Sequence, residues 1–500
     1  MSSPPSSATS SNDPKNEVDQ SSSLLKIESR KIAGEYGRPF FGPIKDRLDY
    51  FYFQGREEFF RTRMLKYQST VFRANMPPGP FISPNSKVII LLDAISFQVL
   101  FDLSKVDKKD VLDGTYLPSL SFTGGYRPCA YLDPSEPHHC KLKSLFFSIL
   151  ASRHHAFIPL FQSNLGSHLF DPLELHVISN KGTANFNNLS DNFCFDFAFR
   201  LFFNKSPSET IMGSNGLKIV TKWLLFQVAP VLSLGSSNKL LNFFEDLIFH
   251  TFPLPWFPVK SGYNKLYKAI HSSSSPILDE AERMGIDRDE TCHNLVFMAI
   301  FNAYGGMKAW FPSLIKWVGL AGPELHQQLV NEIRAIVKAE GVTPSSLEKM
   351  TLTKSVVYEA LRMEPAIPYQ YARAKRDFVI ESHENAVFQV KEGEMLFGYQ
   401  PFATKDPRVF ERAEEFLATR FVGDGEKLLK YVYWSNGRET ENPTVENKQC
   451  PAKDLVVLLS RLMLTEFFLR YDTFTVEVGS LPLGSSVTVT SLTKASNDVK

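Results

Sequence analysis

The stretch that decides the fold is Trp434-Ser435-Asn436-Gly437-Arg438-Glu439-Thr440-Glu441-Asn442-Pro443-Thr444-Val445-Glu446-Asn447-Lys448-Gln449-Cys450-Pro451-Ala452-Lys453-Asp454-Leu455. It is a polar loop that carries one thiol, Cys450, directly before an apolar segment, 455–469, which we expect to be helical. We expect the pKa of Cys450 to be lowered, because the helix dipole and the nearby Lys448 and Lys453 favour a thiolate. A thiolate in this position can hold haem iron from one side, whereas an arbitrary cysteine is more often a small buried side chain.

This loop resembles the haem-ligand loop of the cytochromes P450 in an altered form. The usual pattern is Phe-x-x-Gly-x-x-x-Cys-x-Gly; here Trp434 stands at the Phe, Ala452 at the second Gly, and nine residues are inserted between Gly437 and Cys450. The run 447–450, Asn-Lys-Gln-Cys, is similar to the ligand motif of the plant P450s that metabolise fatty acid hydroperoxides. These are the allene oxide synthases, hydroperoxide lyases and divinyl ether synthases. The resemblance extends over roughly residues 30–498.

The resemblance implies a cytochrome P450 fold, which is mainly α with small β-sheets. It also implies a haem b cofactor (iron protoporphyrin IX), with Cys450 as the proximal ligand of the iron. Lys448, in the same motif, is expected to help bind the cofactor. Cations for the haem propionates are expected where the sequence has His138, His139, Lys141 and Lys143; we select Lys141 and leave Lys143 open.

Composition agrees with one large domain. The chain has 500 residues and 42 Phe, and no interior linker rich in Gly, Ser or Pro divides it. We expect residues 1–28, which are rich in Ser and Pro, to be a disordered tail, and residues 29–500 to form a single domain. A net charge of +1 does not suggest a nucleic-acid partner, and five cysteines without paired spacing argue against a disulfide framework.

The N-terminal segment bears on location. It has no run of 18 or more apolar residues, so we expect no transmembrane anchor. It is Ser-rich like a plastid transit peptide, but it contains Asp13, Glu17 and Asp19 and has no Arg before Arg30. We therefore predict a cytoplasmic or peripherally membrane-associated protein outside the plastid, with lipid contact through the apolar loop 252–257.

Local patterns predict a mostly helical chain. Strands are expected at 88–92 and 378–381, and helices at 345–363 and from Asp287 onward, where Asp287-x-x-Glu290 is typical of a helix start.

The helix 345–363 carries Glu359 and Arg362, which share one helix face. In the P450s a third partner comes from a later loop, and Arg420 matches it. We interpret the three residues as a structural ion-pair cluster rather than as catalytic groups.

The long central helix determines the predicted chemistry. A P450 that activates dioxygen usually has an acid and an alcohol in this helix, but the stretch 300–312 has no acid and no Ser or Thr, and Ser313 follows Pro312, which should break the helix. Without this proton relay, a substrate that already contains an O–O bond is favoured. We therefore predict a fatty acid hydroperoxide as substrate and no redox partner.

Asn302 is the candidate catalytic residue. It shares an otherwise apolar stripe with Leu295, Met298 and Gly305. Two interpretations are open: the amide bonds a neighbouring carbonyl, or, as the resemblance implies, it contacts the peroxide group.

Three short segments, 368–372, 431–434 and 450–453, are most similar to hydroperoxide lyases that accept both 9- and 13-hydroperoxides. We predict a lyase that cleaves such hydroperoxides to aldehydes and oxo-acids without dioxygen or reductase. The alternatives are an allene oxide synthase, a divinyl ether synthase or an epoxyalcohol synthase of the same family. From other classes, a conventional P450 monooxygenase and a non-catalytic haem or lipid carrier remain open.

Overall fold

The computed structural model describes residues 28–495 except 80, 84, 113–115, 180–181, 237, 384–385 and 483. The predicted disordered tail lies outside this part of the chain, apart from Glu28, the first residue of a strand. The assignment of 29–500 to a single domain stays a prediction.

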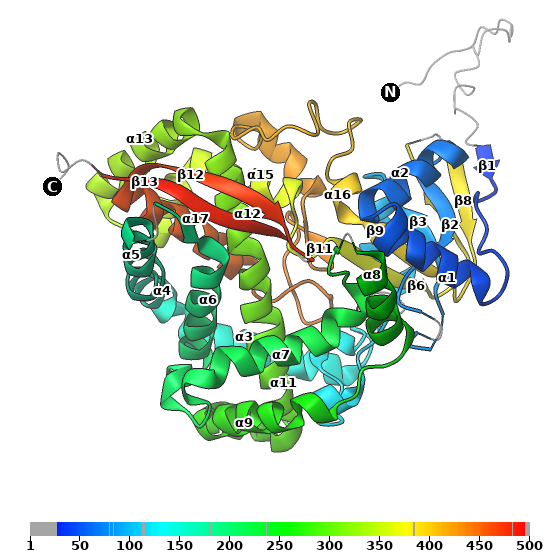
Figure 1. Cartoon of the computed structure of the whole chain (residues 1–500), viewed down its shortest axis with the longest axis horizontal. Helices are drawn as coiled ribbons and strands as arrows, with labels where there is room; N and C mark the ends of the chain where they lie inside the picture. The colour runs from blue at the N-terminus through cyan, green and yellow to red at the C-terminus, as the bar shows by residue number, and fades with distance from the viewer. Residues whose placement is uncertain are drawn as a thin grey trace, which may run out of the picture.

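Helices form the larger part of the molecule. The prediction of a mainly α structure with small sheets is confirmed. The helices are α1 (Phe41–Leu48), α2 (Arg56–Tyr67), α3 (Pro137–Arg153), α4 (Phe157–Leu165), α5 (Asp171–Ser179), α6 (Phe186–Phe203), α7 (Gly216–Val228), α8 (Lys239–Glu245), α9 (Phe257–Ser273), α10 (Ser275–Arg283), α11 (Arg288–Val296), α12 (Gly305–Ala321), α13 (Pro323–Glu340), α14 (Pro344–Lys349), α15 (Thr351–Met363), α16 (Gln400–Ala403) and α17 (Lys453–Arg470). Figure 1 shows most of these helices gathered on one side, while α1, α2 and α16 lie beside the strands near the N-terminus.

Within the described part of the chain, the strands form four small sheets. The largest has the order β2-β3-β9-β6-β4, in which β3 and β9 are parallel and the other neighbours antiparallel. The others have the orders β1-β8-β7, β12-β13-β5 and β10-β11. The strands are β1 (Glu28–Arg30), β2 (Val71–Asn75), β3 (Lys87–Leu91), β4 (Val106–Asp107), β5 (Ala184–Asn185), β6 (Tyr369–Ala374), β7 (Phe378–Glu381), β8 (Ala386–Val390), β9 (Met395–Tyr399), β10 (Tyr433–Trp434), β11 (Gly437–Arg438), β12 (Tyr471–Ser480) and β13 (Ser485–Lys494).

The strands expected at 88–92 and 378–381 are confirmed as β3 and β7. The single helix expected over 345–363 is wrong, because α14 and α15 are separated at Met350. The reason is a tertiary cap. The carboxylate of Glu332, on α13, accepts the backbone N–H groups of Leu352 (2.8 Å) and Thr353 (2.9 Å) and so starts a new helix.

One long helix crosses the helical part and consists of α11, a π-helical stretch η11 (Phe297–Tyr304) and α12 (Figure 1). Asp287 caps its start as predicted, since its carboxylate accepts the N–H groups of Asp289 and Glu290. The expectation that Pro312 breaks the helix is wrong: α12 continues to Ala321. Burial of this turn offsets the loss of one backbone hydrogen bond, because Pro312 and its neighbours lie in the core.

Phenylalanines fill the main core, especially on α6, where Phe193, Phe197 and Phe199 are fully buried. The ring of Phe161, on α4, packs edge-on against Phe197 at 5.0 Å. Among the described residues, the structure contains no helix both long and apolar enough to cross a membrane.

Candidate functional site

The cysteine loop runs from the β10–β11 hairpin to the start of α17. Cys450 lies three positions before the first residue of α17, Lys453, whose N–H donates to the Cys450 carbonyl (3.2 Å). The Cys450 N–H donates to the carbonyl of Ser435 in the hairpin turn (3.2 Å). The thiol is therefore placed by backbone hydrogen bonds on both sides of it, and the residue is half-buried.

The side chains around Cys450 shape the inserted segment. The Asn447 carboxamide oxygen accepts the N–H groups of Thr444 and Gln449 (both 3.1 Å), which folds the insertion into a compact turn. Gln449 is buried and donates to the carbonyl of Arg438 (2.6 Å). A Cβ built on Gly437 would lie 2.7 Å from Cδ of Gln449, so this side chain needs a glycine opposite it.

Lys448 connects the cysteine loop to η4 (Cys129–Tyr131), the turn before α3. Its ammonium donates to the carbonyls of Cys129 (3.2 Å), Ala130 (2.8 Å) and Leu132. An ammonium has three protons, so these contacts engage all of them. The structure thus supports a loop-positioning role for Lys448, and its contact with a cofactor stays a prediction.

We expect Lys448→Met to weaken this connection, because the substitution leaves partly buried carbonyls without a donor. The loss in the free energy of unfolding should be about 1–3 kcal/mol, accompanied by a lower haem content per protein. Thermal denaturation and the pyridine haemochrome assay measure the two quantities. Lys338→Met, an exposed lysine on α13, is the matched control. Equal stability and haem content in the two variants would contradict the role.

The prediction that the pKa of Cys450 is lowered is wrong. Burial raises the pKa of the thiol, while the Ala452 N–H and the Lys143 charge oppose this shift. Lys448 donates to η4, and Lys453 donates to the Glu439 carbonyl (2.8 Å), so neither cation is directed to the sulfur. A metal ion that coordinates a thiol deprotonates it by itself, so ligation does not require a low intrinsic pKa.

Helix α3 packs against the cysteine loop through buried polar residues. The Lys143 ammonium donates to the backbone carbonyl (2.5 Å) and the side-chain oxygen (3.1 Å) of Asn447. Burial lowers the pKa of Lys143 to about 8 and that of His139 to about 4. The thiol of Cys140 donates to the Val445 carbonyl (3.5 Å). Lys143, which the sequence left open, is the cation of α3 that lies at the cysteine loop.

Lys141 lies elsewhere. Its side chain is exposed, and its ammonium ends beside Gly285, where a Cβ built on the glycine would be 3.6 Å away. His138 is also directed outward from the loop and pairs with Glu290 at 2.6 Å. The structure therefore does not bring Lys141 to the loop of Cys450 and Lys448, and its assignment to a haem propionate stays a prediction.

Asn302 lies in η11, the π-helical stretch of the central helix. Its side chain is exposed although residues 297–300 are buried, and among the described residues no hydrogen-bond partner is found for it. Gly306 is four positions further on, on the same helix face, and a Cβ built there would meet nothing within 4 Å. Asn302 therefore does not bond a neighbouring carbonyl, and its amide is free to contact a ligand. π-Helical turns inside α-helices are frequent at functional sites.

Hydrogen bonds between side chains and distant segments join the central helix to the parts that hold the cysteine. The side-chain oxygen of Asn294, on α11, accepts the N–H of Cys129 (2.8 Å), whose carbonyl accepts from Lys448. The indole N–H of Trp310, on α12, donates to the hydroxyl of Ser460 on α17 (2.7 Å). Sequence reasoning missed Asn294 and Trp310, because their partners come from other segments and leave no local pattern.

The predicted ion-pair cluster is confirmed. Both oxygens of the Glu359 carboxylate bind the guanidinium of Arg362 (2.7 and 2.8 Å) and the Nε of Arg420 (3.0 Å each). Glu359 and Arg362 are fully buried. Arg362 also donates to the carbonyls of Thr404 and Ala413, so the cluster fastens the segment before the cysteine loop to α15.

A second cluster of titratable groups lies apart from the cysteine. Ligand atoms of Asp93, His383 and Asp406 lie within 4.8 Å of one another. Both carboxylates already accept backbone hydrogen bonds, Asp93 from Ser96 (2.9 Å) and Asp406 from Ala94 (3.0 Å). His383 lies 3.0 Å from the Asp406 carboxylate. We interpret this group as structural.

The chain is similar to known proteins over almost its whole length. The family model described as cytochrome P450 matches residues 320–436. The chain is 56% identical to allene oxide synthase 3 of Solanum lycopersicum, over 95% of this chain and 96% of that protein. It is 54% identical to the chloroplastic allene oxide synthase 1 of the same species (99% and 91%), and 49% identical to a 9-divinyl ether synthase of Capsicum annuum (94% and 98%).

These relatives overturn the predicted location outside the plastid. Allene oxide synthase 1 and three further relatives, 53–55% identical to this chain, are named chloroplastic. The prediction gave too much weight to Asp13, Glu17 and Asp19, and a few acidic residues in a Ser-rich tail are weak evidence against import. The tail itself lies outside the described residues.

Proposed function

This chain belongs to the cytochrome P450 family that includes the plant allene oxide synthases and divinyl ether synthases, and on that premise we propose that it is a haem-thiolate allene oxide synthase. The substrate would be a polyunsaturated fatty acid hydroperoxide, converted without dioxygen, NADPH or a reductase. The relatives' names support this alternative over the hydroperoxide lyase that the short segments suggested. The cofactor of this family is haem, and we propose haem b.

The residues present fit a haem. Cys450 is a half-buried residue at the end of a polar loop held by hydrogen bonds, and the central helix leaves open space at Gly306. When bound through Cys450, haem iron supplies homolytic cleavage of the substrate O–O bond. Lys143 and Lys448 hold the loop in place from α3 and η4 through their carbonyl contacts.

The observation that carries the proposal is the free amide of Asn302, in a stretch of the central helix, 300–312, that has no acid and no Ser or Thr. An amide N–H can donate to the hydroperoxide oxygen and hold the substrate in one orientation, and it needs no proton supply. The segment 297–304, Phe-Met-Ala-Ile-Phe-Asn-Ala-Tyr, contains no carboxylate and no Ser or Thr that could relay protons. Its one hydroxyl belongs to Tyr304, which is fully buried and lies 3.5 Å from the Thr221 hydroxyl on α7. A conventional monooxygenase, which needs such a relay, is therefore disfavoured.

The decisive experiment is product analysis of the purified holoenzyme with 9- and 13-hydroperoxides and no reductase. An allene oxide forms by loss of one water from the hydroperoxide and then hydrolyses to ketols, whereas a divinyl ether has the same mass and does not hydrolyse. Lyase chemistry gives two aldehyde fragments, and an epoxyalcohol keeps the mass of the substrate. Ketols as main products support the proposal. Turnover that begins only with NADPH and reductase would contradict it.

Asn302→Ala should cut turnover per haem by about 100-fold or change the product mixture, by analogy with removal of one well-placed hydrogen-bond donor. The thermal midpoint should stay close to that of the wild type, because the amide has no partner within the described residues. Asn294→Ala is the matched control: it removes a bonded amide on the same helix and should lower the midpoint instead. Full activity of Asn302→Ala would show that the Asn302 amide has no role in the reaction.

Location and lipid contact complete the proposal. The names of four relatives support a plastid location, which a fluorescent fusion of the full chain tests. In the predicted lipid-contacting loop, Phe252 and Phe257 are 51% and 76% exposed, while Trp256 packs against the core. Phe252 stacks on the exposed Phe81 at 5.5 Å, which extends the apolar surface beyond the loop.

A further inference from the structure

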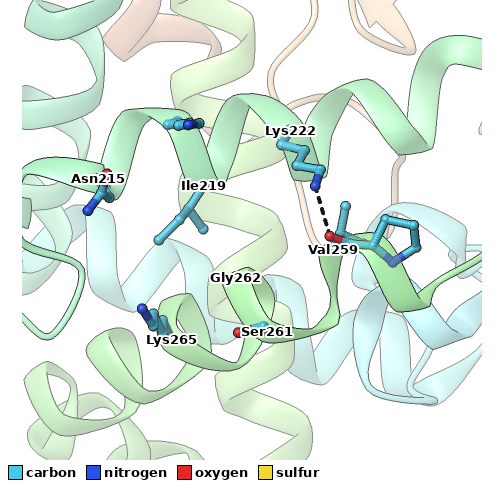
Figure 2. A pocket seen from close by; sticks show the side chains of 9 residues that line it. Asn215, Ile219, Lys222, Val259, Ser261, Gly262 and Lys265 are labelled. Carbon is cyan, nitrogen blue, oxygen red and sulfur yellow. Dashed lines mark hydrogen bonds between the residues drawn. The ribbon is translucent and has the colours of Figure 1, made fainter.

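A groove runs between α7 and α9, and Figure 2 shows side chains from both helices along it. It contains two adjoining cavities of about 280 and 490 Å³, which share Ser261 and Lys265 in their walls. The groove is open to solvent and belongs to neither the cysteine loop nor the central helix.

Five lysines line this groove, and all five are exposed. They are Lys218 and Lys222 on α7, and Lys260, Lys265 and Lys268 on α9. Neither helix contains a single Asp or Glu, and the stretches 210–244 and 251–278 are also free of acids. Within the described part of the chain, none of the five lysines forms an ion pair.

Close helix packing brings the two lysine rows together. A Cβ built on Gly262 would lie 3.2 Å from Cγ2 of Ile219, so the glycine allows α9 to approach α7. The rings of Trp223 and Tyr263 stack beneath the groove at 5.7 Å. Lys222 donates to the carbonyl of Pro258 across it (3.0 Å), which positions one cation (Figure 2).

Exposed apolar side chains lie beside the charges. Phe257 and Ile211 line the second cavity and are 76% and 60% exposed. A surface that combines clustered lysines with exposed aromatic and aliphatic groups is typical of proteins that lie on anionic membranes. The lysines meet the headgroups, and the apolar groups enter the acyl boundary.

We propose that the α7–α9 groove binds the anionic headgroups of a lipid bilayer, with Phe257 and Ile211 inserted at the acyl boundary. The occupant is a surface with many negative charges, because five exposed like charges repel one another and a single small anion would neutralise only part of them. This proposal rests on the lipid contact proposed above for the loop 252–257, with which the groove shares Phe257, and it does not depend on the reaction at Cys450.

The test is flotation of the full-length holoenzyme with vesicles of phosphatidylcholine, alone or mixed with phosphatidylglycerol. We expect preferential binding to the mixed vesicles, weakened by added salt. The triple variant Lys218→Gln, Lys222→Gln, Lys265→Gln should bind mixed vesicles about 100-fold more weakly. The matched control, Lys338→Gln, Lys427→Gln, Lys430→Gln, changes three exposed lysines outside the groove and should bind like the wild type.

The variant Phe257→Ser separates the apolar contribution to vesicle binding from the contribution of the lysine charges. It should weaken binding to both kinds of vesicle and keep the preference for those with phosphatidylglycerol. An equal loss in both triple variants would overturn the proposal, because it would show a general effect of net charge. Unchanged binding by the groove variant would overturn it as well. Saturable binding of inorganic phosphate or of a free fatty acid, without preference for anionic vesicles, would identify a small-anion site and reject the bilayer.

Discussion

Cys450→Ala should abolish thiolate-ligated haem and all hydroperoxide turnover. Cys450 is the one thiol in the polar loop before α17, and backbone hydrogen bonds on both sides of it fix its position. Cys450→Ser should also lack thiolate-ligated haem and turnover, because a neutral hydroxyl binds iron much more weakly than a thiolate does. The measurement is the absorption spectrum of the purified ferric protein and of its reduced carbon monoxide complex.

Cys140→Ala is the matched control for this result. Its thiol also contacts the cysteine loop, through the carbonyl of Val445, but it lies on α3. We expect this variant to keep the spectrum of the wild type. An unchanged ferric spectrum in Cys450→Ala would contradict the assigned ligand, and with it the proposed chemistry.

Glu359→Ala should destabilise the protein by about 3–5 kcal/mol, the usual effect of removing one partner from a buried ion pair. The substitution leaves the guanidinium of Arg362, which is fully buried, and that of Arg420 without their shared carboxylate. Since natural domains are stable by only about 5–15 kcal/mol, a large part of the protein should fail to fold or to retain haem. Urea denaturation followed by circular dichroism measures the loss.

The pair Arg283–Glu280 provides the control for Glu359. It has the same three-residue spacing on a helix and an N–O distance of 2.6 Å, but the arginine is 71% exposed. Glu280→Ala should change stability by less than about 1 kcal/mol, because solvent screens exposed pairs. If Glu359→Ala and Glu280→Ala lowered the free energy of unfolding equally, burial of the Glu359 ion pairs would not be the cause of their contribution to stability.

Several features were predictable from local sequence because the physics that produces them is local. Asp287 caps a helix through N–H groups two and three residues away, and β3 and β7 follow from short runs of β-forming residues. Motif order was also informative: Glu359, Arg362 and Arg420 were predicted to form one cluster, and the structure joins them.

Other features depended on segments far apart in the chain. Pro312 was expected to end a helix, but burial of the surrounding turn keeps the helix intact. The division of 345–363 into α14 and α15 depends on Glu332, which no local pattern identifies as a cap. The low pKa expected for Cys450 considered the neighbouring charges and omitted desolvation, which is the larger effect.

The sequence by itself determined the family and the helical class, because these are encoded in residue order and motif spacing; the same spacing led to the prediction of Cys450 as the ligand. Only the tertiary structure decided which lysine lies at the cysteine loop. Lys141 and Lys143 are two positions apart on α3, and a helix turns by about 200° over two residues, so one faces solvent and the other Asn447. The structure likewise decided that the Asn302 amide is free. Contacts of this kind are set by the packing of distant elements, and sequence spacing alone does not specify them.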